Sequence, residues 1–569
     1  RILILQHIYD IASVCAAHGI ESAIISPGSR SAALTLAFVR HPEIETKIIS
    51  DERSAAFIAM GMAQQQGKPV ALICTSGSAA YNYAPAIAEA FYQEIPLLIL
   101  TADRPPEWTN QYDGQTIQQS NIYGKHVLAS YDFPAEVNHE DAKWHCNRMI
   151  NEAINASISR KGPVHINVPI REPFYPDSNE VVSFPEVRII KNTPMEGAIH
   201  LTQWMDLGKK WQSHTRKAIV LGQMGYSSSL HTALYRFAEK AGIPIIADVI
   251  SNQHDLPEVI HNQDSFLNPQ LNTAHKKLAP TLLITVGKSL ISKNLKLYLR
   301  DNPPKEHWHI SSSEKLNDSL QHLTDLIKMD PAIFFAEFAQ HVGGKGSFSY
   351  LNQWQQANQT VEKGKADFMK MKKFSEFQAF NTVLNMVPNK AKLHFANSMA
   401  IRYANIIGAP KNKQTEVFAN RGTSGIDGSN STAVGAALSQ KLPVVLFTGD
   451  MAFFYDRNAF WHNYNLKNLR VIVFNNHGGG IFRMIDGPKR QPELEEYFET
   501  KQKLNAENTA KDFGFEYHCC SNLKDLKGCL EEFYSASKNA KILEIQTNSE
   551  RNTEVFAEYK KAILDTFKA

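Results

Sequence analysis

The sequence predicts an α/β protein of three tandem doubly wound domains, each built on a parallel sheet. Short continuous apolar runs, such as VALIC at 70–74 and PVVLF at 443–447, recur along the chain and lead into Gly, Ser, Pro or Thr. Such runs are typical of strands that are buried on both faces. Stretches with helical spacing, such as ERSAAFIAMGMAQQQ at 52–66, lie between them, so we expect parallel pairing through crossover helices. A chain of 569 residues is also too long for one hydrophobic core and fits three or four domains.

The first predicted domain covers residues 1–180. Its predicted strands lie in the segments SAIISPGSRS, VALICTSGSAA, PLLILTADRPP and GPVHINVPI, each of which runs from apolar residues into a turn. VPIREPFYP at 168–176 is interpreted as the exit from this domain. In open α/β sheets, ligands bind outside the carboxyl ends of the strands. The candidate site residues of this chain cluster at such strand ends.

Two further domains are predicted, at 190–345 and 375–569. The central one has strands in AIVLGQMG, GIPIIADV and TLLITVGKSL, and a polar, lysine-rich stretch from about 340 to 375 separates it from the last domain. The last domain carries KLHFANSMA, EVFANRGTSGIDGS, LPVVLFTGDMAFF, LRVIVFNNHGGGIF and AKILEIQT. These segments again alternate strand and helix patterns.

Composition excludes several classes of protein. The formal net charge of +3 argues against a nucleic-acid-binding surface built on bulk charge. The apolar runs are far shorter than the roughly 20 residues of a membrane-spanning helix, and we find no pattern of a secretory leader. The cysteines show no paired zinc spacing, and a cytoplasmic protein with reduced thiols is expected. They are Cys15, Cys74, Cys146, Cys519, Cys520 and Cys529.

Two apolar strands in the last domain end in oxygen-bearing side chains. PVVLFTGD ends at Asp450, and LRVIVFNN ends at Asn475 and Asn476, with glycines close behind. A carboxylate, an amide oxygen and a backbone carbonyl together suit a hard divalent cation such as Mg²⁺. Alone, the Gly-Asp is more often a turn and the Asn-Asn pair more often a cap. At the ends of strands about 26 residues apart, they fit one crossover unit.

This stretch resembles the diphosphate-binding motif of thiamine-diphosphate enzymes, which begins Gly-Asp and closes near Asn-Asn. The resemblance implies that Asp450, Asn476 and the carbonyl of Gly478 bind Mg²⁺ or Mn²⁺, with His477 as a spacer. Residues after Asp450 can open a helix whose first amides meet a phosphate. The residues implied to hold the diphosphate group are Gly449, Asp450, Met451 and Ala452.

The first domain supplies a candidate activating acid, Glu52, in SDERSAAFIAMGMA. On the residues alone, Asp51 and Glu52 simply favour a helix N-terminus. The resemblance implies that Glu52 meets N1′ of the cofactor's aminopyrimidine, whose N4′ then removes the proton from the thiazolium C2. This role needs a raised pKa of Glu52, which an apolar setting can give. The resemblance also implies cofactor contacts from Thr75, Ser76 and Gly77, and a cofactor bent over Ile426.

Four arginines lie in turns where a charge is costly unless an anion meets it. They are Arg30 in SPGSRS, Arg104 in TADRPP, Arg402 in NSMAIRY and Arg421 in ANRGTSG. A guanidinium group binds a carboxylate through two parallel hydrogen bonds. Each arginine alone is more often a surface or salt-bridging residue, but four in strand-end loops predict a site for a polyanionic substrate.

Six motifs in order resemble the menaquinone-pathway synthases that join 2-oxoglutarate to isochorismate: PGSRS, DER, TSGSA, TADRPPE, NRGTSGIDG and NNHGGGIF. The resemblance implies decarboxylation of 2-oxoglutarate and 1,4-addition of the resulting succinyl carbanion to isochorismate. It covers both outer domains; in the central one, SLISKNL matches less clearly and gives Lys293, with Asn294 where some members have Arg. Substrate contacts are implied for Ser29, Arg30, Arg104, Gln115, Lys293, Ser398, Arg402, Arg421, Ile481 and Phe482, of which Ile481 and Phe482 would form an apolar wall that also borders the cofactor.

The resemblance further implies a homodimer or homotetramer, in which Glu52 of one subunit and Asp450 of another serve one cofactor. One alternative is another thiamine-diphosphate-dependent 2-oxo acid decarboxylase or carboligase, for which these arginines would be excessive. A second is a non-catalytic relative that binds a nucleotide or a partner protein. That alternative predicts the loss of Glu52, Asp450 or Asn476, and all three are present.

Overall fold

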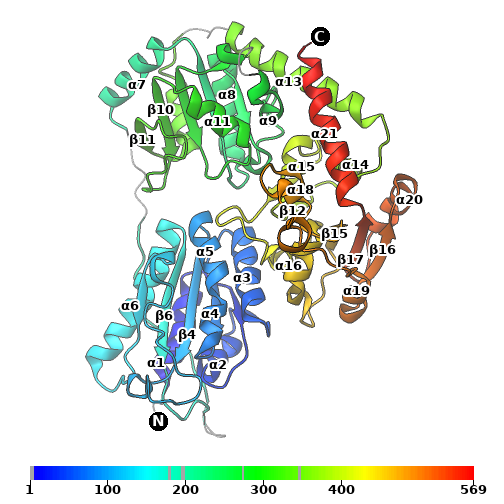
Figure 1. The fold of residues 1–569 in the computed structure, drawn as a ribbon. Helices are drawn as coiled ribbons and strands as arrows, with labels where there is room; N and C mark the ends of the chain where they lie inside the picture. The colour runs from blue at the N-terminus through cyan, green and yellow to red at the C-terminus, as the bar shows by residue number, and fades with distance from the viewer. Residues whose placement is uncertain (1–4, 177–180, 194–198, 272–274, 344–347, 569) are drawn as a thin grey trace.

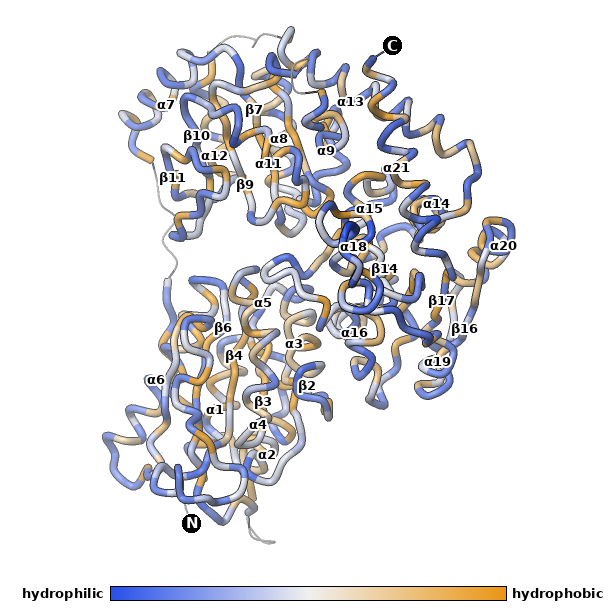
Figure 2. The backbone as a smooth tube through the Cα atoms, in the orientation of Figure 1, coloured by the Kyte–Doolittle hydropathy of each residue, from blue (hydrophilic) through white to orange (hydrophobic). Residues whose placement is uncertain are grey.

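The computed structural model describes residues 5–176, 181–193, 199–271, 275–343 and 348–568. It contains three lobes, each with a parallel β-sheet between helices (Figure 1). The apolar stretches lie along the strands and the inward faces of the helices (Figure 2). The predicted fold class, three doubly wound parallel-sheet domains, is confirmed.

The first sheet has the order β2-β1-β3-β4-β6-β5, with all neighbours parallel. Its strands are β1 (Ser22–Ile25), β2 (Glu45–Ile48), β3 (Val70–Cys74), β4 (Leu97–Asp103), β5 (Ser130–Asp132) and β6 (Pro163–Pro169). Its main helices are α1 (Gln6–Ala17), α2 (Ala32–Arg40), α3 (Glu52–Gln66), α4 (Ser78–Asn82), α5 (Ala84–Gln93) and α6 (Glu140–Arg160). Because β1, β3 and β4 are parallel neighbours, the turns that follow them meet at one edge of the sheet.

The central sheet has the order β11-β10-β9-β7-β8. Its strands are β7 (Lys217–Leu221), β8 (Ile245–Ala247), β9 (Leu282–Val286), β10 (Glu306–Ser311) and β11 (Asp325–Lys328). Its helices include α7 (Leu201–Ser213), α8 (Ser228–Ala241), α9 (Gln263–Phe266), α11 (Lys293–Asp301) and α12 (Pro331–Phe338).

The third sheet repeats the topology of the first, in the order β13-β12-β14-β15-β17-β16. Its strands are β12 (Lys392–Phe395), β13 (Glu416–Phe418), β14 (Val444–Gly449), β15 (Leu469–Asn475), β16 (Glu516–Cys520) and β17 (Lys541–Gln546). Its helices are α14 (Glu376–Asn385), α15 (Met399–Ile407), α16 (Ser429–Ser439), α17 (Asp450–Tyr455), α18 (Ile481–Met484), α19 (Glu507–Phe513), α20 (Leu523–Tyr534) and α21 (Ser549–Thr566).

Helices α3 and α16 join the first and third domains, and both contribute to one buried apolar cluster. Their backbones approach closely at two glycines. A Cβ atom on Gly61 would lie 2.2 Å from the carbonyl oxygen of Thr432, and one on Gly435 would lie 2.2 Å from that of Ile58. Only glycine fits at such crossings. The small-residue pattern of α3 therefore serves a helix–helix contact between domains.

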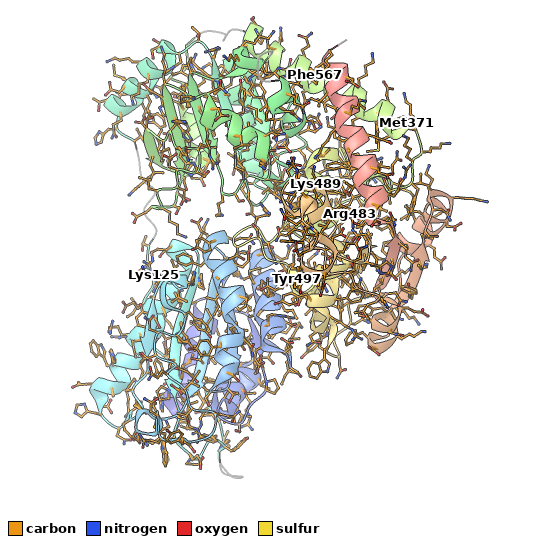
Figure 3. All side chains as sticks on the ribbon, viewed as in Figure 1. Lys125, Met371, Arg483, Lys489, Tyr497 and Phe567 are labelled. Atoms are coloured by element: carbon orange, nitrogen blue, oxygen red, sulfur yellow. The ribbon has the colours of Figure 1, made fainter. Side chains whose placement is uncertain are left out.

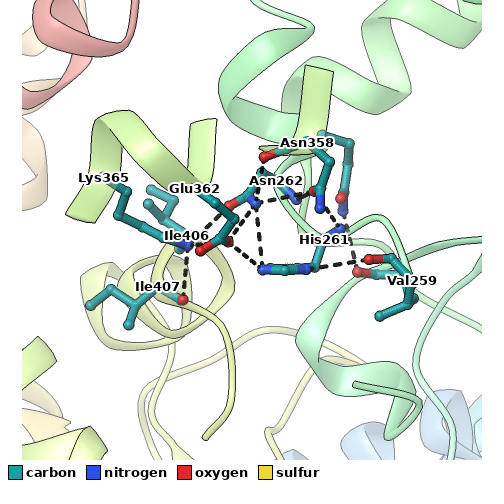
Figure 4. Close-up of polar contacts among 10 residues, drawn as sticks. Val259, His261, Asn262, Asn358, Glu362, Lys365, Ile406 and Ile407 are labelled. Atoms are coloured by element: carbon teal, nitrogen blue, oxygen red, sulfur yellow. Dashed lines mark hydrogen bonds and ion pairs between the residues drawn. The ribbon is translucent and has the colours of Figure 1, made fainter. Parts of the chain in front are cut away.

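The lysine-rich stretch between the last two domains contains a 22-residue helix, α13 (Phe348–Met369), which packs against α21. A polar network fixes α13 to the central domain (Figure 4). The Glu362 carboxylate lies 2.7 Å from the His261 ring and accepts a 2.7 Å hydrogen bond from Asn262. The Lys365 ammonium donates to Asn262 and to the carbonyl oxygen of Ile406 at the end of α15.

The strands that sequence patterns alone did not indicate are β2, β5, β10, β11 and β16. Four of them, β2, β5, β11 and β16, are edge strands, which bury less surface and therefore carry a weaker apolar signal. The fifth, β10, is internal but alternates apolar with polar residues in its sequence EHWHIS. No helix in the described ranges is both long and apolar enough to cross a membrane.

Candidate active site

Asp450 and Asn476 lie side by side at the carboxyl edge of the third sheet, because β14 and β15 are neighbours with Gly449 paired to Phe474. Asp450 begins α17 and is only 1% exposed. Burial raises the pKa of its carboxyl group to about 6, although hydrogen bonds, the largest from Gln502, oppose the rise. Gln502 Nε2 donates to Asp450 Oδ2 at 2.7 Å.

The last residue of β15, Asn475, and the residue that follows it, Asn476, bind different partners. Asn475 is structural, because its Nδ2 donates to Glu544 at 2.6 Å and its Oδ1 accepts from the backbone N–H of His477 at 3.0 Å. Asn476 donates through Nδ2 to Glu376 Oε2 at 2.9 Å. Its Oδ1 is buried without a hydrogen-bond partner among the described residues. The backbone turns sharply at His477, whose φ is 62°.

These residues fit a hard divalent cation. Asp450 supplies a buried carboxylate and Asn476 an amide oxygen without a described partner. Gly478 hydrogen-bonds to the Asp450 carboxylate through its backbone N–H, and its carbonyl oxygen accepts from the backbone N–H of Gly480 at 3.0 Å. Across the described ranges, no group of three or more His, Cys, Asp and Glu side chains suits a metal ion. Mg²⁺ prefers a site with few protein ligands, such as one carboxylate and two neutral oxygens, that leaves room for phosphate oxygens and water.

The turn after β3 places two hydroxyl groups at the carboxyl edge of the first sheet. Thr75 Oγ1 and Ser76 Oγ are buried and have no partner in the part of the chain that the structure describes. Gly77 follows with φ of 89°, and its N–H donates to Gln119 Oε1 at 2.7 Å. Gln115, which is exposed and also has a positive φ of 57°, packs against Gly77.

Glu52 is the first residue of α3, which the side chain of Asp51 caps by accepting from the backbone N–H of Ser54 at 3.1 Å. The Glu52 carboxylate is half-buried and makes no hydrogen bond or ion pair with any described residue. Burial and the charge of Glu52 together raise the pKa of the Cys74 thiol. The described part of its own subunit thus gives this carboxylate no hydrogen-bond or ion-pair partner.

Arg30 and Arg104 form one cationic cluster. Arg30 is buried, donates to the carbonyl oxygen of Ile170 at 2.9 Å and lies over the ring of Phe174. Burial lowers its pKa, and the charge of Arg104 lowers it further. Arg104 pairs with Asp113 at 3.0 Å. Ser29, next to Arg30, is exposed.

Arg402 and Arg421 form a second cluster at the edge of the third sheet. Burial lowers the pKa of Arg421, and the charge of Arg402 lowers it further. Their hydrogen bonds go to neutral oxygens, from Arg402 to the carbonyl of Ser398 at 2.6 Å and from Arg421 to Asn397 Oδ1 at 3.0 Å. Neither forms an ion pair with a described residue. Lys296, which sequence patterns did not indicate, adds a third cation beside Arg421.

The structure therefore brings the predicted arginines together in two groups and not in one. Within this single chain, no described hydrogen bond or ion pair joins the group of Arg30 and Arg104 to that of Arg402 and Arg421. Lys293 is exposed at the start of α11, where its charge interacts with Lys560. Arg421 also borders a cavity of about 420 Å³ between the three domains.

Three thiamine pyrophosphate enzyme domains match the chain in order. The N-terminal TPP binding domain matches residues 9–122, the middle domain 192–395 and the C-terminal TPP binding domain 400–545. Among solved structures, benzoylformate decarboxylase from Polynucleobacter necessarius has a TM-score of 0.70 at 16% identity, covering 95% of this chain and 98% of that one. At this identity the likeness shows the fold alone.

Full-length relatives share one name. The 2-succinyl-5-enolpyruvyl-6-hydroxy-3-cyclohexene-1-carboxylate synthase of Cytophaga hutchinsonii is 46% identical, covering 99% of this chain and all of the relative. Synthases of the same name from Flavobacterium johnsoniae and Bacteroides thetaiotaomicron are 38% and 35% identical, and each match covers 97% of this chain and 98% of the relative. The chain belongs to this synthase family. The resemblance based on six motifs is confirmed. The predictions that the chain is an enzyme and that its cofactor is thiamine diphosphate are also confirmed.

Several residues of this synthase-family chain that patterns did not indicate hold the site together. Gln119 is buried and binds Gly77 and Asn167. Glu89, on α5, accepts hydrogen bonds from the backbone N–H groups of Gly422 and Thr423. Glu89 could have been found from the sequence, because it is a lone acidic residue on the otherwise apolar face of APAIAEAFYQ. No sequence pattern indicates Gln119, Gln502 or Glu376.

The predicted apolar wall lies on α18, which packs against α21; Arg483, on the same short helix, is labelled in Figure 3. Ile481 packs against the buried cluster below, and the ring of Phe482 lies 6.0 Å from that of Phe498. Arg483 donates to the buried carboxylate of Glu499 at 2.6 and 2.9 Å. Ile426 is half-buried in the loop after Arg421. Their contacts with cofactor or substrate stay predictions.

Proposed function

We propose that this synthase-family chain decarboxylates 2-oxoglutarate and adds the resulting succinyl carbanion in a 1,4 fashion to isochorismate. The products are 2-succinyl-5-enolpyruvyl-6-hydroxy-3-cyclohexene-1-carboxylate, which the relatives' name also gives, and CO₂. The observation that carries this substrate choice is the pair Arg402 and Arg421, which lie together and form no ion pair with a described residue. Both substrates are dicarboxylates, and a pair of guanidinium groups binds such anions well.

Asp450, Asn476 and the Gly478 carbonyl would hold Mg²⁺ or Mn²⁺, and the ion would in turn hold the cofactor diphosphate. Gly449, Met451 and Ala452 are adjacent in sequence to Asp450 and would meet the phosphate oxygens. Apart from its own chain neighbours, no described atom lies within 4 Å of where a Gly449 Cβ would be. The rest of the cofactor would be surrounded by Thr75, Ser76, Gly77, Ile426, Ile481 and Phe482. When bound, thiamine diphosphate supplies the nucleophilic carbon and the electron sink that decarboxylation of a 2-oxo acid requires.

Glu52 would hold a proton at N1′ of the aminopyrimidine. Ser29, Arg30, Arg104, Gln115, Lys293, Ser398, Arg402 and Arg421 would bind and orient the substrates. The free carboxylate of Glu52 supports a homodimer or homotetramer in which the partner subunit completes the site. We also propose a cytoplasmic location, which the six cysteines, free in this structure, support.

The test is an assay on the full chain with thiamine diphosphate, Mg²⁺, 2-oxoglutarate and isochorismate, in which each component is left out in turn. The readout is the loss of isochorismate absorbance. We expect loss only with every component present. Glu52→Gln should reduce the rate by about 100-fold or more, since general acid–base groups contribute that much. Glu140→Gln, which removes an exposed carboxylate at the start of α6, should leave the rate unchanged.

Other outcomes separate the alternatives. Release of CO₂ from 2-oxoglutarate or pyruvate without loss of isochorismate would replace the proposed substrate pair with that of another decarboxylase or carboligase. Absence of both turnover and cofactor binding would contradict catalysis altogether.

A further inference from the structure

Glu376, the first residue of α14, places a buried carboxylate directly behind the predicted metal ligand Asn476. The residue is 5% exposed, and its Oε2 accepts hydrogen bonds from Asn476 Nδ2 at 2.9 Å and from Asn552 Nδ2 at 3.1 Å. Its backbone N–H donates to Asn552 Oδ1 at 2.8 Å. Glu376 and Asn552 therefore bind each other through both backbone and side chain.

This arrangement determines which way the Asn476 amide faces. A backbone N–H only donates, so the atom of Asn552 that meets it is the oxygen, and the Asn552 amide nitrogen must face Glu376 Oε2. When Glu376 is ionised, that oxygen only accepts, so the Asn476 atom beside it is also the nitrogen. The Asn476 oxygen is left on the other side, buried and without a partner among the described residues.

Orientation matters because the amide is asymmetric. Its oxygen can bind a cation, whereas its NH₂ group presents two positive hydrogens to one. Without an acceptor behind it, the Asn476 amide could turn by half a rotation and aim its nitrogen at the cation. Partners behind a metal ligand that fix its orientation commonly contribute about 10- to 100-fold in metal affinity.

We propose that Glu376 is a positioning residue that holds Asn476 with its amide oxygen toward the divalent cation, itself held in place by Asn552. The inference rests on the proposed metal site of Asp450, Asn476 and Gly478. Glu376 touches neither cofactor nor substrate in this role, so it acts only through Asn476.

The experiment measures Mn²⁺ affinity on the full chain with saturating thiamine diphosphate, by the electron paramagnetic resonance signal of free Mn²⁺. Glu376→Ala should weaken Mn²⁺ binding by about 10- to 100-fold. Glu376→Gln keeps an acceptor oxygen behind Asn476 and should stay within about threefold of the wild type. Asp456→Asn, which alters another buried carboxylate of the same domain bound to Ser431, should leave the affinity unchanged.

The outcomes separate this role from others. If Glu376→Ala binds Mn²⁺ as the wild type does, or if Glu376→Gln loses as much affinity as Glu376→Ala, orientation of Asn476 is not what Glu376 provides, and the proposal is wrong. If Glu376→Ala does not fold, Asn552→Ala decides, because it should weaken Mn²⁺ binding and an unchanged affinity overturns the proposal. If the wild type binds no Mn²⁺, or Asp450→Ala binds it equally well, the proposed metal site itself fails.

Discussion

Three polar atoms beside the proposed cofactor are buried without a hydrogen-bond partner in the described chain: Thr75 Oγ1, Ser76 Oγ and Asn476 Oδ1. A buried polar atom without a partner costs about 1–3 kcal/mol. Such atoms also occur elsewhere in this fold, for example at His394. These three lie at the carboxyl ends of parallel strands, where ligands of such sheets bind.

Thr75 offers a test at the residue scale. Thr75→Val keeps the shape of the side chain and removes a hydroxyl that has no described partner. The thermal midpoint of the cofactor-free protein should therefore stay the same or rise, while the Kd for thiamine diphosphate should increase about 3- to 10-fold if the hydroxyl bonds to bound cofactor. Differential scanning fluorimetry and a cofactor titration measure the two quantities.

Thr101→Val is the matched control. Its hydroxyl is buried and lies 2.8 Å from His165 Nε2 and 2.9 Å from Asn167 Oδ1, so its removal should lower the midpoint of the cofactor-free protein. A lowered midpoint for Thr75→Val, with an unchanged Kd, would show that the Thr75 hydroxyl serves the fold and not the cofactor.

At the scale of elements, one helix of the first domain holds a loop of the third. The Glu89 carboxylate on α5 accepts hydrogen bonds from the backbone N–H of Gly422 at 2.6 Å, from that of Thr423 at 2.7 Å and from the Thr423 hydroxyl at 2.6 Å. Gln93 donates a fourth at 2.5 Å. Four donors converge on the two oxygens of this one carboxylate. An ionised carboxylate can accept all four hydrogen bonds, whereas an amide cannot. The loop that is held begins at Arg421.

Glu89→Gln should loosen this loop, because the new NH₂ group faces donors. Loss of one buried hydrogen bond to a charged group costs about 1.5–3 kcal/mol. We expect a lower thermal midpoint and a higher KM for the dicarboxylate substrates, with a smaller change in kcat, since the loop carries Arg421. Steady-state kinetics and thermal unfolding measure both effects.

Glu107→Gln is the control, because it removes a carboxylate from an exposed ion pair with Arg171, and exposed pairs contribute little. If Glu89→Gln lowers the thermal midpoint but leaves KM unchanged, Glu89 stabilises the fold and does not contribute to substrate binding.

At the scale of the whole molecule, the first and third domains share a core across α3 and α16, yet each carries one half of the proposed site. Among the described residues, Glu52 has no hydrogen-bond or ion-pair partner, and no hydrogen bond or ion pair joins the two arginine clusters. Both observations support a site completed by a second subunit, in which the first domain of one chain faces the third domain of another.

Subunit mixing tests this arrangement. Glu52→Gln and Asp450→Ala should each be inactive alone. Co-expressed with different tags, they should form mixed dimers in which one of the two sites has both residues intact, restoring about a quarter of the wild-type activity if mixing is random. Two differently tagged Glu52→Gln chains are the control and should stay inactive. No recovery in proven mixed dimers would place Glu52 and Asp450 in the same chain's site.

The sequence by itself determined the fold class and the family, and it predicted most of the candidate site residues. Continuous apolar runs such as VALIC predict buried parallel strands, and strand ends then locate Asp450, Asn476 and the arginine loops, because every strand of a parallel sheet ends at the same edge. The sequence could not choose between Asn475 and Asn476 without the family resemblance, since both stand at the end of the same apolar run and both carry an amide oxygen that can bind a cation.

Only the tertiary structure decided which side chains hold the site. Glu89 binds a loop 333 residues further along the chain, and Glu376 binds Asn476 across 100 residues. Neither spacing follows a helical or strand period, because the contacts depend on how domains and sheets pack. The same holds for the two separate arginine clusters. Local periodicity records the burial of each element, whereas hydrogen bonds between distant elements exist only after those elements have been packed together.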